Sequence, residues 1–169
     1  AAFGLEIGEG WVALLERRLE TENYPLPVHN ASVSGDTTAG GLARLPALLG
    51  QHAPDLVILE LGGNDGLRGL PPDNMQQNLT AMVEQSRAAG ADVILLGMRI
   101  PPNYGVRYTQ AFEQVYRQIA DRQQVPLVPF LLEGVADRGE LMQADGIHPT
   151  EAAQSLIMES VWQTLKSLL

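Results

Sequence analysis

Two apolar runs of strand length constrain the fold of this chain most. Leucine, isoleucine and valine dominate both Asp55–Leu61 and Ala91–Gly97, and neither run alternates with polar residues. Such runs are typical of parallel strands that are covered on both faces. A helix is predicted between them, over about Asp73–Ala89, and Gly90 ends it. A strand, a helix and a strand in this order imply parallel pairing through a right-handed crossover.

The same reading extends over the rest of the chain and predicts an α/β fold, three-layer α/β/α with a parallel, flavodoxin-like sheet. We expect one domain over residues 1–169. Such a fold normally opens with a strand, so the first strand is apparently missing from this chain. Further helices are expected over Trp11–Glu20, Thr38–Gly50, Tyr108–Gln123 and Pro149–Leu169, and the second of these is capped by Thr38 and stopped by Gly50. Further strands are expected over Val28–Ala31 and Val125–Pro129, and a helical turn over Leu131–Val135. Loops are expected over Gly66–Pro72 and Arg99–Gly105.

Composition argues against several classes of binding partner and of catalytic site. Apolar residues make up 45% of the 169 and charged residues 18%, which is typical of a globular protein. The formal net charge of −9 argues against nucleic acid and against electrostatic docking on anionic lipid. Without cysteine, a thiolate nucleophile and a thiolate metal site are excluded. No apolar run has the length of a membrane span, and no signal-peptide core opens the chain, so we expect a mature or trimmed N-terminus and no stable membrane insertion.

The loop Asp145–Pro149 places a carboxylate three residues before an imidazole, just ahead of the last predicted helix. A neutral histidine serves as a general base when its other ring nitrogen is held in the right tautomer, and a neighbouring carboxylate does this. His148 is therefore the candidate base and Asp145 its orienting partner. The alternative is that Asp145 caps a helix and His148 is a surface side chain.

Two further stretches follow predicted strands, where active sites of doubly wound sheets lie. In Asn30–Thr37, Gly35 could offer a backbone N–H to an oxyanion, and in Gly62–Asp65, Asn64 could offer its side-chain amide. The alternatives are that Gly35 only satisfies a positive-φ turn and that Asn64 is an ordinary turn residue. Asp65 is interpreted as only a turn carboxylate.

Together these three stretches resemble the SGNH-hydrolase, or GDSL-lipase, family. Gly35 matches its second block, Gly62–Asp65 its G-x-N-D block and Asp145 to His148 its D-x-x-H block, in the family's order. The resemblance spans the whole chain and is closest to bacterial multifunctional acyl hydrolases of the thioesterase I, lysophospholipase and arylesterase kind. The family's first block, a strand that ends in G-D-S-x-S with the serine nucleophile, is not found here.

We expect that strand and its nucleophilic serine just upstream of Ala1. An interior parallel strand is hard to remove, since its loss would expose apolar surface and two rows of unpaired backbone groups. Ser34 is the only serine beside a candidate oxyanion donor, and the family gives that position no nucleophilic role. Ser32 is interpreted as structural.

The resemblance implies a serine acyl hydrolase that cleaves carboxylic esters and thioesters (acyl-CoA, lysophospholipid and aryl esters) through an acyl-enzyme. It implies no metal and no cofactor, a small-molecule substrate, a periplasmic or secreted bacterial enzyme and a mobile loop near Gly66–Pro71; we also expect a monomer. Arg68 and Arg107 could attract an anionic head group. Acyl-chain contacts are expected from the apolar loop residues Leu67, Leu70, Ile100, Pro101, Tyr104 and Ile147.

Other readings remain open from the sequence. A carbohydrate O-acetyl esterase would need a small acyl pocket, and a non-catalytic acyl- or lipid-binding domain would follow if the nucleophile were truly absent. A flavodoxin-like binder of a phosphate-bearing ligand would need a glycine-rich phosphate fingerprint, which is not visible. Asp36, Asp65, Asp73 and His148 could be imagined as a metal site, but a set with one histidine is unconvincing.

Overall fold

The computed structural model describes residues 3–169 and contains two units. One, unit 1, comprises the chain up to Ser34 together with Leu131–Leu169, and the other, unit 2, is Gly35–Phe130. The segment upstream of Ala1, where the nucleophile is expected, lies outside the described residues.

Unit 2 is built on a parallel sheet of three strands, β1 (Leu56–Leu59), β2 (Asp92–Leu96) and β3 (Leu127–Val128), in the order β1-β2-β3. Leu56 pairs with Asp92, and Leu95 pairs with Leu127. β1 and β2 fall inside the two predicted apolar runs and β3 inside the strand predicted over Val125–Pro129, so the α/β class with a parallel sheet is confirmed. The observed strands are shorter than the runs because the ladder closes only where two neighbours overlap.

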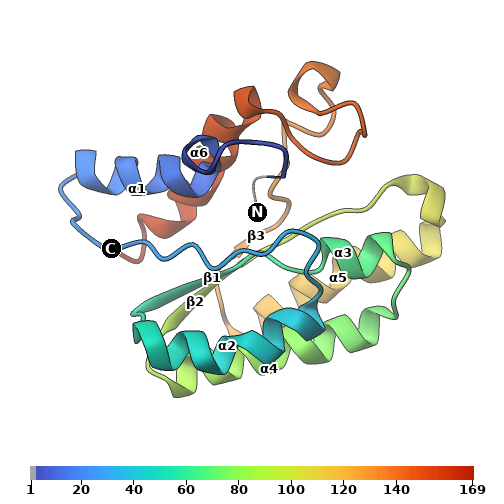
Figure 1. The fold of residues 1–169 in the computed structure, drawn as a ribbon. Helices are drawn as coiled ribbons and strands as arrows, with labels where there is room; N and C mark the ends of the chain where they lie inside the picture. Colours follow the sequence, from blue (N-terminus) through green and yellow to red (C-terminus); the bar gives the residue numbers. More distant parts are fainter. Residues whose placement is uncertain (1–2) are drawn as a thin grey trace. The chain divides into compact units, whose positions relative to one another are not determined.

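The helices α2 (Thr38–His52), α4 (Pro72–Ala88) and α5 (Val106–Gln123) lie along one face of this sheet (Figure 1). Their apolar sides form a core with the strands, in which Leu79, Leu95 and Tyr116 are almost fully buried. Two short helices complete unit 2 at the ends of strands, α3 (Gly63–Leu67) after β1 and the 3-10 turn η2 (Pro102–Tyr104) after β2.

The ends of α2 differ from the prediction. Thr37, not Thr38, is the N-cap, because the Thr37 hydroxyl accepts a hydrogen bond from the Gly40 N–H. The helix does not stop at Gly50 but continues to His52, and Ala53 ends it in the left-handed conformation at φ 42°. The predicted loop after β1 is also wrong in part, since α3 extends through Gly66 and Leu67.

Unit 1 contains the helices α1 (Trp11–Thr21) and α6 (Gln154–Leu165), which pack side by side, and the 3-10 turns η1 (Ile7–Glu9), η3 (Gly139–Leu141) and η4 (Glu151–Ala153). The predicted helix from Trp11 is confirmed. The buried Gln154 amide oxygen accepts the Trp11 N–H at 3.0 Å, and the Arg18 guanidinium lies 5.2 Å from the ring centroid of Trp162. These contacts hold the two helices together.

Two further predictions in unit 1 are wrong, and one is confirmed. Val28–Ala31 is not a regular strand: Pro25 and Pro27, just before it, have no N–H to donate to a ladder. Pro149 does not start the last helix, because it forms an antiparallel bridge with Met142, and the helix begins as η4 and ends at Leu165. The predicted helical turn over Leu131–Val135 is confirmed, because the N–H groups of Val135 and Ala136 both donate to the Leu132 carbonyl at 3.0 Å. Among residues 3–169, no helix is long and apolar enough to cross a membrane.

Candidate active site

Asp145 and His148 are in direct contact in unit 1. The Asp145 Oδ2 lies 2.7 Å from Nδ1 of His148, while Asp145 Oδ1 accepts the backbone N–H groups of Ile147 at 2.9 Å and His148 at 3.0 Å. Gly146 has φ +65°, a conformation that glycine adopts without strain, and it allows the chain to turn back between the two side chains. One carboxylate therefore orients the imidazole and shapes the loop at the same time.

These hydrogen bonds keep Asp145 ionised. The pKa of its carboxyl falls from 3.8 to about 2, first because the His148 side chain binds it and then because the backbone N–H groups of His148 and Ile147 do. Both side chains of the pair remain more than a third exposed, at 37% for His148 and 38% for Asp145. With Nδ1 bound to the carboxylate, Nε2 is the nitrogen that can take a proton from an attacking group.

Gln143 and Phe3 support this loop, and the sequence-based interpretation missed both. The Gln143 backbone N–H donates to the His148 carbonyl at 2.7 Å, and its side-chain amide donates to the carbonyls of Phe3 at 2.8 Å and Pro149 at 3.0 Å. The Phe3 ring stacks on the imidazole with 4.3 Å between centroids. No motif spacing marks these residues; only the fold of the loop reveals their role.

In unit 2 the segment of Gly35 is tied to α3, the helix that contains Asn64. Asp65 is 3% exposed and accepts the Thr38 N–H at 2.8 Å and the Thr38 hydroxyl at 2.6 Å. Arg68, just after α3, donates to the Gly35 carbonyl at 2.9 Å. The interpretation of Asp65 as only a turn carboxylate is therefore wrong, because its side chain joins α3 to the start of α2.

The two candidate oxyanion donors have different surroundings. Gly35 has φ +78°, so its conformation also satisfies a positive-φ turn. Within residues 3–169 the Asn64 side-chain amide makes no hydrogen bond with the protein, which leaves its N–H groups able to bind a ligand. Gly62, the residue before α3, has φ +117°, and a Cβ there would lie 2.2 Å from the Tyr116 hydroxyl, so α3 can begin in this position only after a glycine.

Two tyrosine hydroxyls hold the segment after α3. Tyr104 donates to the Leu67 carbonyl at 2.7 Å, and Tyr108 donates to the Leu70 carbonyl at 2.6 Å. Burial, and then the charge of Asp65, raises the pKa of Tyr108, so its phenol remains a hydrogen-bond donor at neutral and mildly alkaline pH.

The predicted acyl-contact residues have unequal exposure. Leu70 and Ile147 are each 38% exposed, whereas Ile100 is 8% exposed and belongs to the core of unit 2. Pro101 precedes η2, and Tyr104, which ends η2, is partly buried. Leu67 and Tyr104 are joined through the hydrogen bond described above, so these two residues occupy one surface of unit 2.

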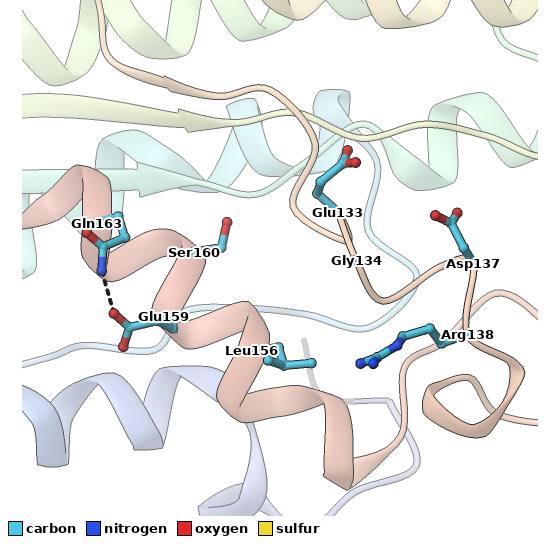
Figure 2. Close-up of a pocket in the computed structure, with 8 residues that line it drawn as sticks. All are labelled: Glu133, Gly134, Asp137, Arg138, Leu156, Glu159, Ser160 and Gln163. Atoms are coloured by element: carbon cyan, nitrogen blue, oxygen red, sulfur yellow. Dashed lines mark hydrogen bonds between the residues drawn. The ribbon is translucent and has the colours of Figure 1, made fainter.

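A separate hollow of about 630 Å³ lies in unit 1 and contains none of the predicted site residues (Figure 2). Its lining residues include the acidic Glu133, Asp137 and Glu159 and the apolar Leu156. In the described part of the chain, no group of three or more histidine, aspartate or glutamate side chains could hold a metal ion. Of the imagined metal ligands, Asp65 binds Thr38 and Asp36 binds Arg44.

Comparison with known proteins places these residues in a family. The GDSL-like Lipase/Acylhydrolase family model matches residues 2–156. "Esterase TesA" of Pseudomonas aeruginosa is 59% identical over all of this chain and 84% of its own length, and "Thioesterase 1/protease 1/lysophospholipase L1" of Escherichia coli K12 is 43% identical over all of this chain and 80% of its own length. A crystal structure of TesA superimposes with a TM-score of 0.97 at 58% identity, over all of this chain and 94% of that one. The acyl-hydrolase class expected from the three blocks is thus confirmed, and the chain belongs to the GDSL-like lipase/acylhydrolase family.

Proposed function

We propose that this serine acyl hydrolase uses His148 as its general base and Asp145 as the residue that orients it. The observation that carries this assignment is the 2.7 Å contact between Nδ1 of His148 and the Asp145 carboxylate. A carboxylate that is already ionised at neutral pH holds the imidazole in the tautomer with a free Nε2, and it stabilises the imidazolium that forms when Nε2 takes a proton.

The reaction proceeds in two steps. A serine outside the 169 residues attacks the carbonyl carbon of the ester or thioester while His148 Nε2 takes its proton, and the same proton then goes to the leaving alcohol or thiol. Water, activated by His148, releases the acid from the acyl-enzyme. The Gly35 N–H and the Asn64 amide bind the oxyanion, and the free Asn64 side chain supports this role.

The substrate classes follow from the relatives. One is named an esterase and another a thioesterase and lysophospholipase, so we propose that this chain hydrolyses esters and thioesters, including acyl-CoA, lysophospholipid and aryl esters. The acyl chain is expected to contact the apolar loop residues Leu67, Leu70, Ile100, Pro101, Tyr104 and Ile147.

The remaining assignments rest on the family. One family model spans residues of both units, which supports a single SGNH-hydrolase domain over residues 1–169. The relatives are bacterial, and we propose a monomer that is periplasmic or secreted, as the family resemblance implies.

Inactivation of the natural protein by diethyl p-nitrophenyl phosphate tests the proposal. We expect loss of p-nitrophenyl ester hydrolysis as one diethyl phosphoryl group adds, with peptide mass spectrometry mapping the adduct to one serine N-terminal to Ala1. His148→Ala should lower kcat about 10²–10⁴-fold, as expected for a general base.

His52→Ala provides the matched control, because His52 lies on the last turn of α2 and has no role in the proposed reaction. It should retain the kcat of the natural protein. A phosphoryl adduct on Ser34, or an unchanged kcat in His148→Ala, would contradict the assignment of the nucleophile or of the base, respectively.

A further inference from the structure

The helix α3 contacts the Gly35 segment at two points that lie on either side of the proposed oxyanion donors. At one point, both carboxylate oxygens of Asp65 bind Thr38, at 2.8 Å from its N–H and 2.6 Å from its hydroxyl. At the other, the Arg68 guanidinium binds the Gly35 carbonyl at 2.9 Å. Gly35 is three residues before Thr38, and Asn64 is directly before Asp65, so these contacts link the two donors through short stretches of chain.

The contact at Thr38 is buried and its hydrogen bonds have a fixed direction. Thr38 is fully buried and Asp65 is 3% exposed. Since the Thr38 hydroxyl donates its proton to Asp65 Oδ1, its oxygen is left to accept the Asn78 side-chain amide, which lies at 3.0 Å. A chain from α4 through α2 to α3 results, in which each donor has an acceptor.

The contact between Arg68 and Gly35 is exposed, and a second arginine binds the residue that follows Gly35. Asp36, the next residue, forms an ion pair with Arg44 of α2, with distances of 2.8 Å to Nη2 and 3.1 Å to Nε. The carbonyl of Gly35 and the carboxylate of Asp36 are thus each bound by an arginine, one after α3 and one within α2. The Gly35–Asp36 peptide group, whose carbonyl Arg68 binds, has little freedom to rotate as a result.

We propose that Asp65 is a positioning residue for acyl transfer: with Thr38 and Arg68, it sets the place of the Gly35 N–H relative to the Asn64 amide. This inference rests on the proposed function, because it concerns the two donors assigned there. Oxyanion donors act through preorganised geometry, and a displacement of about 1 Å is enough to reduce a rate about 100-fold. A carboxylate that accepts two hydrogen bonds in a buried site supplies the rigidity that such geometry needs.

Asp65→Asn tests the buried contact, because the amide keeps the size of the carboxylate and offers one acceptor in place of two. We expect kcat for a p-nitrophenyl ester to fall about 10- to 100-fold with KM within about twofold, since the loss is confined to the transition state. Asp121→Asn makes the same chemical change on the exposed surface of α5 and should leave kcat unchanged.

Thr38 allows a matched pair of variants, one that removes its hydroxyl and one that keeps it. Thr38→Val removes the hydroxyl that binds Asp65 and should lower kcat about tenfold, whereas Thr38→Ser keeps that hydroxyl and should remain within about threefold of the natural protein. A purely structural role would lower the melting temperature of both variants without this difference in kcat at constant KM. Equal kcat in Thr38→Val and the natural protein would overturn the role of this contact.

Arg68→Met tests the exposed contact and keeps the proposal falsifiable if Asp65→Asn does not fold. We expect kcat to fall about three- to tenfold, because the freed Gly35 peptide samples other orientations, with partial recovery in Arg68→Lys. Arg122→Met, on the exposed last turn of α5, serves as its control. A rise in KM alone would mean that Arg68 binds substrate and does not position Gly35.

Asn64→Ala distinguishes failure of this inference from failure of the proposed function. Loss of a working oxyanion donor lowers kcat about 100- to 1000-fold. If Asn64→Ala shows that loss while Asp65→Asn, Thr38→Val and Arg68→Met all retain the natural kcat, the positioning role is overturned and the proposed site stands. If Asn64→Ala itself retains the natural kcat, the oxyanion assignment fails and the positioning role fails with it.

Discussion

Asp145 performs two tasks with its two carboxylate oxygens. Oδ2 binds the His148 ring, and Oδ1 binds the two backbone N–H groups that close the loop. The pKa of the carboxyl is lowered from 3.8 to about 2, so the group is ionised in the folded protein at every pH above about 4. Its contribution to stability is fully present above pH 4 and is lost as the pH falls through 2.

Asp145→Asn should lower kcat at pH 8 to 9, above the range in which an imidazole ordinarily titrates. The amide N–H can face Nδ1 and stabilise the tautomer whose Nε2 already carries a proton, so we expect a loss of about 10²–10⁴-fold. Profiles of kcat against pH for both proteins measure it. Asp137→Asn, in the acidic hollow of unit 1, is the matched control and should retain the natural kcat. An unchanged kcat of Asp145→Asn at pH 8 to 9 would contradict the orienting role of the carboxylate.

At the residue scale, prediction from sequence succeeded for side chains in contact that are also close together in the sequence. Asp145 and His148 are three residues apart, and the structure brings their side chains together. It failed for Asp65 and Gln143, whose partners Thr38 and Phe3 are distant in sequence. A carboxylate that is buried in the fold and one that lies in a turn look alike in a sequence, because burial is set by the packing of other elements.

At the scale of elements, the hydroxyls of Tyr104 and Tyr108 hold the segment that was expected to be mobile. The acceptors are the carbonyls of Leu67 and Leu70, and each lost hydrogen bond is worth about 1 kcal/mol, or about a fivefold change in an opening equilibrium. The double variant Tyr104→Phe/Tyr108→Phe should therefore exchange the amide hydrogens around Leu67–Leu70 about 20- to 30-fold faster.

Hydrogen–deuterium exchange followed by mass spectrometry measures this rate peptide by peptide. Tyr24→Phe makes the same substitution at an exposed position in unit 1 and should leave the exchange of Leu67–Leu70 unchanged. If the double variant exchanges at the natural rate, α3 and Pro71 hold the segment without the tyrosines, and the expectation of a hydroxyl-controlled loop is wrong.

The elements themselves were predictable to different degrees. The strands β1 and β2 were found because uninterrupted leucine, isoleucine and valine are specific to a covered parallel strand. The expected regular strand at Val28–Ala31 did not form, since one or two apolar residues after Pro25 and Pro27 are a weak strand signal. The helix α2 continues past Gly50 to His52, because a glycine stops a helix only where the chain must turn, and here the turn is made by Ala53 in the left-handed conformation.

At the scale of the whole molecule, the excess of acidic residues should govern the approach of charged substrates. The formal net charge of −9 comes from 20 acidic and 11 basic residues, and its field repels an anion over about a Debye length, roughly 10 Å at 0.1 M salt. Arg68 and Arg107 oppose that repulsion locally, because both are exposed cations on unit 2. The salt dependence of KM for an anionic acyl-CoA therefore shows whether the overall charge or the local arginines have the larger effect.

We expect the overall charge to dominate, so that KM for an acyl-CoA falls severalfold as NaCl is raised from about 20 to 200 mM, because added salt screens the repulsion. KM for an uncharged p-nitrophenyl ester with the same acyl chain is the control and should not change. An acyl-CoA KM that rises with salt would contradict this expectation and would assign the thioester's phosphates to a local cationic contact. Arg107→Met would then identify it, since loss of the contacting arginine would reverse the direction of the salt dependence.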